Sequence, residues 1–421
     1  MAERTEKTAR RPFSAPVWRN RDFVLLWTGQ AVSTIGTRVS GLAFPLLVLA
    51  QTHSPAKAGI VGFAQTLPYM LFYLPAGALV DRWDRKRVMI IADAARAVAL
   101  GSIAVALTAG ELTLAQIIAV GFVEGTGFVF FSVSERAALP QVVPSEQISN
   151  AVAQNQARDQ GADLLGQPLG GALFGLSRLL PFAFDAISYA VSFVSLLFIR
   201  TQFQEQRERT TTRIRADIAE GVTWLWGQPF LRAGVGLVAG SNFAFSAIFL
   251  ALIVRAKQLG ASPAAIGIML MLFGAGAIAG ALVAPWVQRR VHAKVTIMTS
   301  FWVWAALAAA TPFIHSVYAI GGMWSFGALF GPIFNVSFAV YRYALVPDRL
   351  LGRVGSASQF VAWGAIPIGQ LTAGLLLGQL GTRPTILWLA GASAIVASLA
   401  TVSPSIRHAP RVEELTAATQ S

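Results

Sequence analysis

Three ionisable side chains lie deep inside long apolar stretches of this sequence: Arg38, Glu124 and Asp163. A charge in such a stretch costs roughly 2.5–3.5 kcal/mol on membrane-insertion scales, so each one is a candidate for function. At a rise of about 1.5 Å per residue, Arg38 lies about 22 Å into its stretch, Glu124 about 16 Å and Asp163 about 19 Å. In a hydrocarbon core of about 30 Å, all three fall near the middle. The chemistry that they could perform is proton binding and release inside a membrane.

Arg38 and Glu124 are predicted to face one cavity and to lie near enough to interact. Gln30 and Thr34 extend a polar stripe on the helix face of Arg38. A carboxyl group beside an arginine releases its proton and binds one again when the pair is broken, so Glu124 could carry protons. The alternative is a static ion pair that only fixes helix packing. Asp163 is the second candidate for proton carriage.

The other charged residues at helix depth are given structural roles. Asp93 and Arg96 are three residues apart, and Arg158 and Asp159 are adjacent. Both groups are expected nearer the cytoplasmic ends of their helices, where they would tie helices together. Asp185 is expected close to the outer end of its helix, reaching the interface.

The second half of the chain offers amides and aromatic rings in place of acids. Between residues 221 and 412 the only acid is Asp348, which we expect in a loop. We select Asn242, Asn335 and Gln359 as cavity residues, because an apolar cavity with a few polar groups suits a drug-like amphiphile. The alternative is that most of the aromatic side chains here face lipid or ordinary core.

Membrane-spanning helices must position these residues. The chain has 421 residues, of which 55% are hydrophobic and 13% charged, whereas roughly a quarter of a soluble domain is charged. A spanning helix needs roughly 20 mostly apolar residues, and we predict twelve: 23–50, 58–80, 88–109, 113–134, 151–176, 180–199, 231–254, 264–287, 295–314, 317–340, 354–380 and 384–404. The predicted fold class is an all-α membrane protein.

The basic residues indicate how these helices are oriented. Of the 33 Lys and Arg residues, 25 fall on the side of the predicted termini and 5 on the other, which places both termini in the cytoplasm. We therefore expect a multi-pass protein of the plasma (inner) membrane, with cytoplasmic segments at 1–22 and 405–421. The stretch 200–230 is predicted to be a cytoplasmic linker containing an amphipathic helix. The charge does not indicate nucleic-acid binding, since it marks loops and forms no basic groove.

Other chemistries have little support in the sequence. There is no cysteine, the four histidines are scattered, and no phosphate-binding loop is present. We expect no cofactor, no metal and no enzymatic activity.

An internal repeat divides the chain in two. Residues 77–87 match residues 280–290 at six of eleven positions, a shift of 203 residues that recurs elsewhere in the chain. The repeat predicts two six-helix bundles, 23–199 and 231–404, in the same orientation. The pseudo-axis would run along the membrane normal, with a substrate site between the bundles.

The segment 77–87 resembles the loop 2–3 signature of the major facilitator superfamily. The matching residues are Gly77, Leu79, Asp81, Arg82, Arg85 and Lys86, and Asp84 replaces the usual glycine. The resemblance implies twelve helices in two pseudo-symmetric bundles. It also implies a cytoplasmic gating motif in which Asp81 meets the N-terminus of helix eleven, with Arg136 as a further member.

Further segments resemble the macrolide-efflux and enterobactin-exporter branch of that superfamily, namely 20–30, 45–49, 137–140 and 185–188. Residues 162–171 resemble the antiporter motif of helix five, with Gln167 at its proline position and Pro168 one residue later. The resemblance implies proton-coupled efflux of a hydrophobic drug, siderophore or secondary metabolite, and we expect the protein to act as a monomer. The alternatives are an importer or uniporter of the same fold, or a membrane sensor or scaffold that transports nothing.

Overall fold

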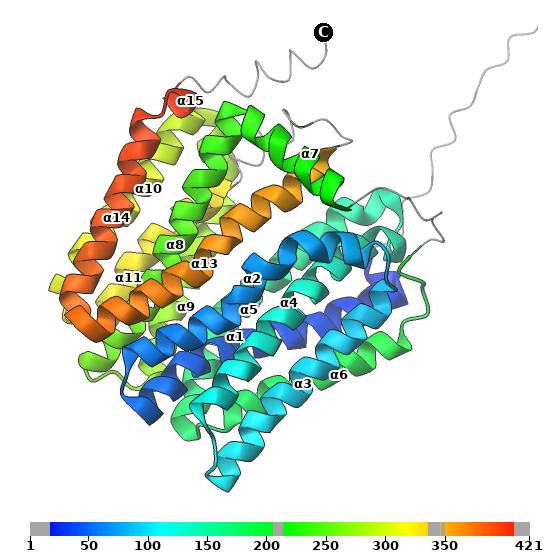
Figure 1. Ribbon diagram of the computed structural model, residues 1–421, viewed down its shortest axis with the longest axis horizontal. Coiled ribbons are helices and arrows are strands. Elements are labelled where there is room, and N and C mark those ends of the chain that lie inside the picture. Colours follow the sequence, from blue (N-terminus) through cyan, green and yellow to red (C-terminus); the bar gives the residue numbers. More distant parts are fainter. Residues whose placement is uncertain (1–16, 205–213, 336–345, 347–349, 408–421) are drawn as a thin grey trace, which may run out of the picture.

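The computed structural model describes residues 17–204, 214–335, 346 and 350–407, and every regular element in these ranges is a helix (Figure 1). Asp348, the first 16 residues and the tail from residue 408 lie outside the described residues. Ten of the described helices are long and apolar enough to cross a membrane by length and composition alone. The predicted all-α membrane fold is therefore confirmed.

The first bundle contains six helices: α1 (Arg21–Thr52), α2 (Pro55–Val80), α3 (Arg85–Ala109), α4 (Leu114–Val142), α5 (Ile148–Leu176) and α6 (Leu180–Phe198). The second contains α8 (Pro229–Gln258), α9 (Pro263–Arg290), α10 (Ala293–Ala310), α11 (Val317–Ala328), α13 (Leu351–Leu380) and α14 (Thr382–Val402). The span that begins with α11 is described as far as Asn335. Each of the twelve predicted stretches overlaps one of these helices.

Two further helices, α7 (Ile214–Gly227) and α15 (Pro404–Arg407), lie at one end of the molecule in Figure 1. We call this the terminal side, because α1 begins and α14 ends there, and the opposite end the far side. A helix, α7, does lie in the predicted linker 200–230, and its Leu225 is buried in one apolar cluster with Leu231 and Val354. The side chains of residues 211–218 lie outside the described part.

Capping residues explain where several spans begin. The Oδ1 atom of Asn20 accepts hydrogen bonds from the backbone N–H groups of Asp22 and Phe23, both at 3.1 Å. Ser54 and Ser262 cap α2 and α9 in the same manner, and each is followed by a proline at the first helical position. The first backbone N–H groups of a helix have no partner within the helix. A capping side chain accepts hydrogen bonds from them, and a proline removes one of them.

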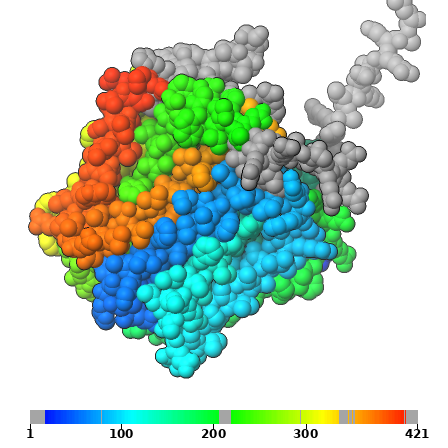
Figure 2. Space-filling view, viewed as in Figure 1, coloured from blue at the N-terminus to red at the C-terminus, as the bar shows by residue number. Residues whose placement is uncertain are grey.

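The bundles lie side by side and meet along α2 and α13 (Figures 1 and 2). They also meet along α5 and α9. The shift of 203 residues carries α5 onto residues 351–379, which is α13, and carries α2 onto 258–283, which overlaps α9. The two contacts are thus equivalent under the repeat, as expected for a pseudo-axis along the membrane normal.

Glycines bring the bundles into backbone contact near the far side. A Cβ atom added to Gly374 of α13 would lie 2.6 Å from the Cα atom of Gly59 on α2. A Cβ atom added to Gly171 of α5 would lie 3.0 Å from the carbonyl carbon of Pro263, the first residue of α9. Both contacts involve the start of a helix at the far side, so the bundles are closed against each other there.

Gly171→Ala is expected to open the far side, because its methyl group collides with the backbone of Pro263. The readout is a disulfide between cysteines placed at Ala56 and Gly378, whose Cβ positions lie 3.1 Å apart, in a chain with no cysteine of its own. We expect the oxidative cross-link yield to fall severalfold. Gly175→Ala is the matched control, since a Cβ atom at Gly175 meets nothing within 4 Å. An unchanged yield in Gly171→Ala would show that this contact does not hold the far side closed.

Candidate functional site

An ion pair links α1 and α5 in the middle of the first bundle's spans. The Nε atom of Arg38 lies 2.7 Å from Oδ1 of Asp163. The two side chains are 40% and 38% exposed, although they lie near the middle of two long helices. Charged groups at this depth normally face a bundle interior or a water-filled space. The exposure of this pair indicates open space beside it.

The pair lies where the first bundle faces the second. A Cβ atom on Gly274 of α9 would lie 3.6 Å from the backbone of Asp163, so α5 faces the second bundle at this point. Toward the far side, a cavity lies against the same face of α1. Its lining includes Gly41 and Pro45, which follow Arg38 by three and seven residues and share its helix face. Its lining comes from α1, α2, α8 and α13: Gly41, Phe44, Pro45, Ala58, Val61, Gly62, Gln65, Phe249, Leu250 and Gln370.

Aromatic rings join the bundles at the same depth. The Trp363 ring of α13 lies 5.5 Å from each of the Tyr69 and Tyr73 rings of α2. It stacks on Phe128 of α4 with the ring centres 6.1 Å apart. Trp363 is twelve residues after the first residue of α13, about 18 Å along the helix. One ring from the second bundle therefore packs among three from the first at mid-membrane.

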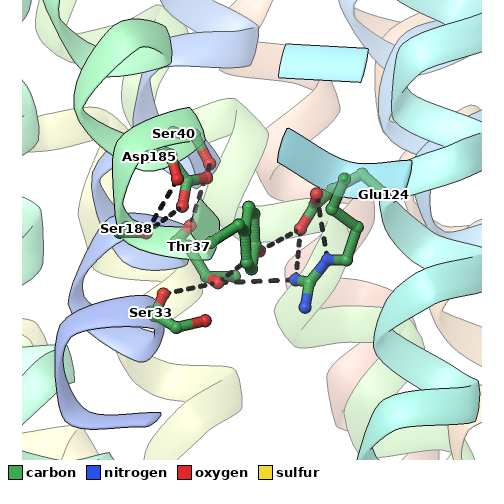
Figure 3. A network of polar contacts seen from close by, with 8 residues as sticks. Ser33, Thr37, Ser40, Glu124, Asp185 and Ser188 are labelled. Atoms are coloured by element: carbon green, nitrogen blue, oxygen red, sulfur yellow. Dashed lines mark hydrogen bonds and ion pairs between the residues drawn. The ribbon is translucent and has the colours of Figure 1, made fainter. Parts of the chain in front are cut away.

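A second ion pair is buried inside the first bundle (Figure 3). Arg96 of α3 donates to both carboxylate oxygens of Glu124 on α4, at 3.1 Å from Nε and 2.5 Å from a terminal nitrogen. Both side chains are 4% exposed. Two parallel bonds between a guanidinium and a carboxylate form the strongest geometry for such a pair.

Hydroxyl groups extend this pair toward α1 and α6. The Tyr189 hydroxyl of α6 lies 2.7 Å from Oε1 of Glu124 and 2.7 Å from Oγ1 of Thr37 on α1. The Arg96 guanidinium lies 3.9 Å from the centre of the Tyr189 ring. Four helices are thus held together by one polar network.

The predicted contact between Arg38 and Glu124 is wrong, because each residue has a different partner. Depth along a helix was estimated correctly, but depth does not fix which way a side chain points around the helix axis. Arg96 was also placed too near a helix end. Since α3 begins at Arg85, Arg96 is about 16 Å along it and level with Glu124.

Asp185 lies close to one end of its helix, as expected, but the expectation that it reaches the interface is wrong. Its carboxyl group is fully buried and is hydrogen-bonded to the Ser40 hydroxyl of α1 at 2.5 Å and to the Ser188 hydroxyl at 3.0 Å. It lies only five residues after the start of α6, but this end of α6 is covered by α1.

Gln30 also points into the bundle. It donates to the Ser192 hydroxyl at 2.7 Å, and that hydroxyl donates to Asp93 at 2.5 Å. Gln30 is 5% exposed, so it does not border the space between the bundles. Thr34 is half-buried, and its hydroxyl donates to the Gln30 carbonyl oxygen at 2.7 Å.

The selected residues of the second bundle are spread over three places. Asn242 donates to the Ala362 carbonyl oxygen at 2.8 Å and links α8 to α13. Gln359 is half-buried on α13, and Asn335 is exposed where the description of its helix stops. Within the described residues, no group of three or more His, Asp or Glu side chains is placed to hold a metal ion.

The segment between α2 and α3 is fixed to its own bundle. Arg85 donates to the carbonyl oxygens of Ala137 and Phe203 and pairs with Asp81 at 3.2 Å. Lys86 donates to the Ile199 carbonyl oxygen at 2.6 Å. The Asp81 side chain remains 68% exposed beside Arg85.

The remaining members of the predicted gating motif lie around the same loop. Gly77 is in the last turn of α2, and Arg82 and Arg136 are exposed. Asp84, which replaces the usual glycine, caps α3 through a bond from the Arg87 backbone N–H at 3.1 Å. The departure from the signature therefore has a structural role as an N-cap.

One buried pair was not anticipated. Arg158 of α5 binds Glu135 of α4 at 2.8 Å and Asp159 at 3.0 Å. Glu135 lies one residue beyond the predicted end of its span, whereas α4 continues to Val142. Extending the predicted helix beyond its apolar stretch would have placed Glu135 within the helix, where it could pair with Arg158.

The comparisons with known proteins agree with this architecture. Residues 12–419 match the family model described as transmembrane secretion effector. The multidrug efflux pump Tap of Mycolicibacterium fortuitum is 25% identical over 89% of this chain and 93% of its own. Macrolide efflux protein A of Streptococcus pyogenes is 23% identical over 93% of this chain and 97% of its own.

Solved structures show the same fold. A bacterial homologue of the human lysosomal transporter Spinster superposes with a TM-score of 0.72 at 14% identity, over 94% of this chain and 98% of its own.

Proposed function

Because the chain belongs to the transmembrane secretion effector family of the major facilitator superfamily, we propose that it exports a small hydrophobic molecule in exchange for protons. The observation that carries the proposal is the Arg38–Asp163 pair, half exposed between the bundles at mid-membrane. The two relatives named as efflux proteins support export as the direction of transport.

In this proposal Asp163 is the group that binds the transported proton. When Asp163 is ionised, it neutralises Arg38. When it is protonated, the ion pair is lost and one positive charge remains beside the cavity. Substrate and proton then bind alternately, because the binding of each one changes the charge of the Arg38–Asp163 pair that the other one encounters. One proton moving through 100 mV supplies about 2.3 kcal/mol, which is enough to drive useful accumulation.

The state described here is proposed to be open toward the cytoplasm. The distribution of Lys and Arg places the terminal side in the cytoplasm of a plasma-membrane protein. The backbone contacts at Gly374 and Gly171 then close the external side. Rocking of the bundles about the pseudo-axis would release these contacts and expose Asp163 to the outside.

The cavity lining supports a substrate that is apolar with a few hydrogen-bonding groups. Two amides, Gln65 and Gln370, face a wall that includes Phe44 and Phe249. This composition suits a hydrophobic drug, a siderophore or a secondary metabolite. The working unit in this proposal is a monomer in the bilayer, with the substrate and protons as partners and without nucleic acid.

The test is substrate uptake into inside-out membrane vesicles that contain the protein and have an acidic interior. A panel of hydrophobic drugs, siderophores and secondary metabolites is offered, and the gradient is collapsed with an ionophore as the control. We expect at least one compound to accumulate only while the gradient is present. A compound that moves equally with and without the gradient would identify a uniporter, and failure of every class to move would contradict export.

A further inference from the structure

Asp185 is a fully buried carboxyl group whose partners are hydroxyl groups. Ser40 lies 2.5 Å from one carboxyl oxygen and Ser188 lies 3.0 Å from the other (Figure 3). Neither partner carries a charge. Burial of an ionised carboxylate is strongly unfavourable unless a cation compensates it, so the lack of a charged hydrogen-bond partner bears directly on whether Asp185 is ionised.

The nearest cation is committed elsewhere. Among the described residues, Arg96, Glu124 and Tyr189 interact electrostatically with Asp185. Arg96 uses two of its nitrogens on Glu124, and that pair is neutral as a whole. On the remaining side the α1 backbone at Gly36 packs directly against the Asp185 carboxyl group, which leaves no room there for another cation.

The hydrogen bonds around Ser40 are compatible with a neutral acid. Its single hydroxyl hydrogen is within reach of two acceptors, the Thr37 carbonyl oxygen at 3.3 Å and Asp185 at 2.5 Å. If Asp185 is protonated, it donates to Ser40, and Ser40 donates to Thr37, so both contacts are satisfied. The Thr37 carbonyl oxygen also lies inside α1, where the helix ladder pairs it with the backbone N–H of Gly41. The neutral acid is therefore favoured by the burial of Asp185 without a cation beside it among the described residues.

We propose that Asp185 is a proton-binding site, separate from the Arg38–Asp163 pair, and that it holds a proton in the state described here. It lies about 8 Å from the far-side start of α6. Ser40 also contacts the backbone carbonyl oxygen of Thr37, and the side-chain hydroxyl of Thr37 contacts the Tyr189 hydroxyl. Its part in transport, as a second proton carried by the first bundle, rests on the proposed proton-coupled export.

The test is infrared spectroscopy of the protein reconstituted in lipid at neutral pH, comparing wild type with Asp185→Asn. We expect the difference spectrum to contain one carboxylic-acid carbonyl band that is lost in the variant. Ser33→Ala is the matched control, because Ser33 is equally buried on α1 and is expected to keep the band. A flat difference spectrum in this region for folded Asp185→Asn would overturn the proposal.

Asp185→Glu covers the case in which the asparagine variant does not fold. It keeps a protonatable group in a changed position, so we expect the band to shift in frequency while its intensity stays. A band unmoved by Asp185→Glu would assign it to another acid and reject the site. Neither measurement needs a substrate, so a failure here is distinguishable from a failure of the proposed export.

Discussion

Asp163→Asn is expected to abolish pH-driven accumulation of substrate while leaving the protein folded. Asparagine cannot release or bind a proton, so the proposed coupling is lost. The loss of one coupled proton at 100 mV removes about 2.3 kcal/mol of driving force, which corresponds to about 50-fold in accumulation. The measurement is the steady-state substrate ratio in inside-out vesicles with an imposed gradient.

The half-exposed position of Asp163 separates this effect from a folding defect. Solvent-accessible ion pairs contribute roughly 0–1 kcal/mol to stability, so the melting temperature should change little. Asp84→Asn is the matched control, because it removes the same charge at an N-cap where asparagine caps equally well. Wild-type accumulation by Asp163→Asn would remove this residue from the coupling mechanism.

Unlike Asp163→Asn, which is expected to leave the stability nearly unchanged, Glu124→Gln is expected to lower the stability of the fold strongly. It leaves the Arg96 guanidinium buried without a counter-charge, since the two groups are 4% exposed and bind each other through two bonds. Removal of one partner of such a pair costs about 3–5 kcal/mol. The measurement is the thermal or denaturant unfolding of purified protein in detergent.

The double variant Arg96→Leu with Glu124→Leu provides the control. It removes both charges and fills the volume with apolar side chains, so we expect it to recover most of the lost stability. If Glu124→Gln unfolds like wild type, the pair is not a structural element. If the double variant is as unstable as the single one, the loss does not come from an uncompensated charge.

The helices and their arrangement could be predicted because they depend on long-range patterns. Apolar stretches of spanning length mark each helix, and the shift of 203 residues relates the two bundles. The same shift relates α5 to α13. Each of these helices packs against the other bundle, α5 against α9 and α13 against α2. Small residues such as Gly171 and Gly374 mark where those helices approach closely.

The partners of the buried charges could not be predicted in the same way. Arg38 and Glu124 do lie at the depths expected, yet one faces Asp163 and the other Arg96. The difference is a rotation about the helix axis, which is set by packing against neighbouring helices. The burial of Asp185 could not be predicted for the same reason. Its distance from the helix end does not indicate that the α1 backbone covers it.

The most direct test of the central claim is proton movement during transport by purified protein in liposomes that enclose a pH-sensitive dye. With no pH gradient imposed, a gradient of transported substrate should drive protons in the opposite direction in wild type, and Asp163→Asn should move none. Substrate flux at the wild-type rate without any proton movement would contradict the account.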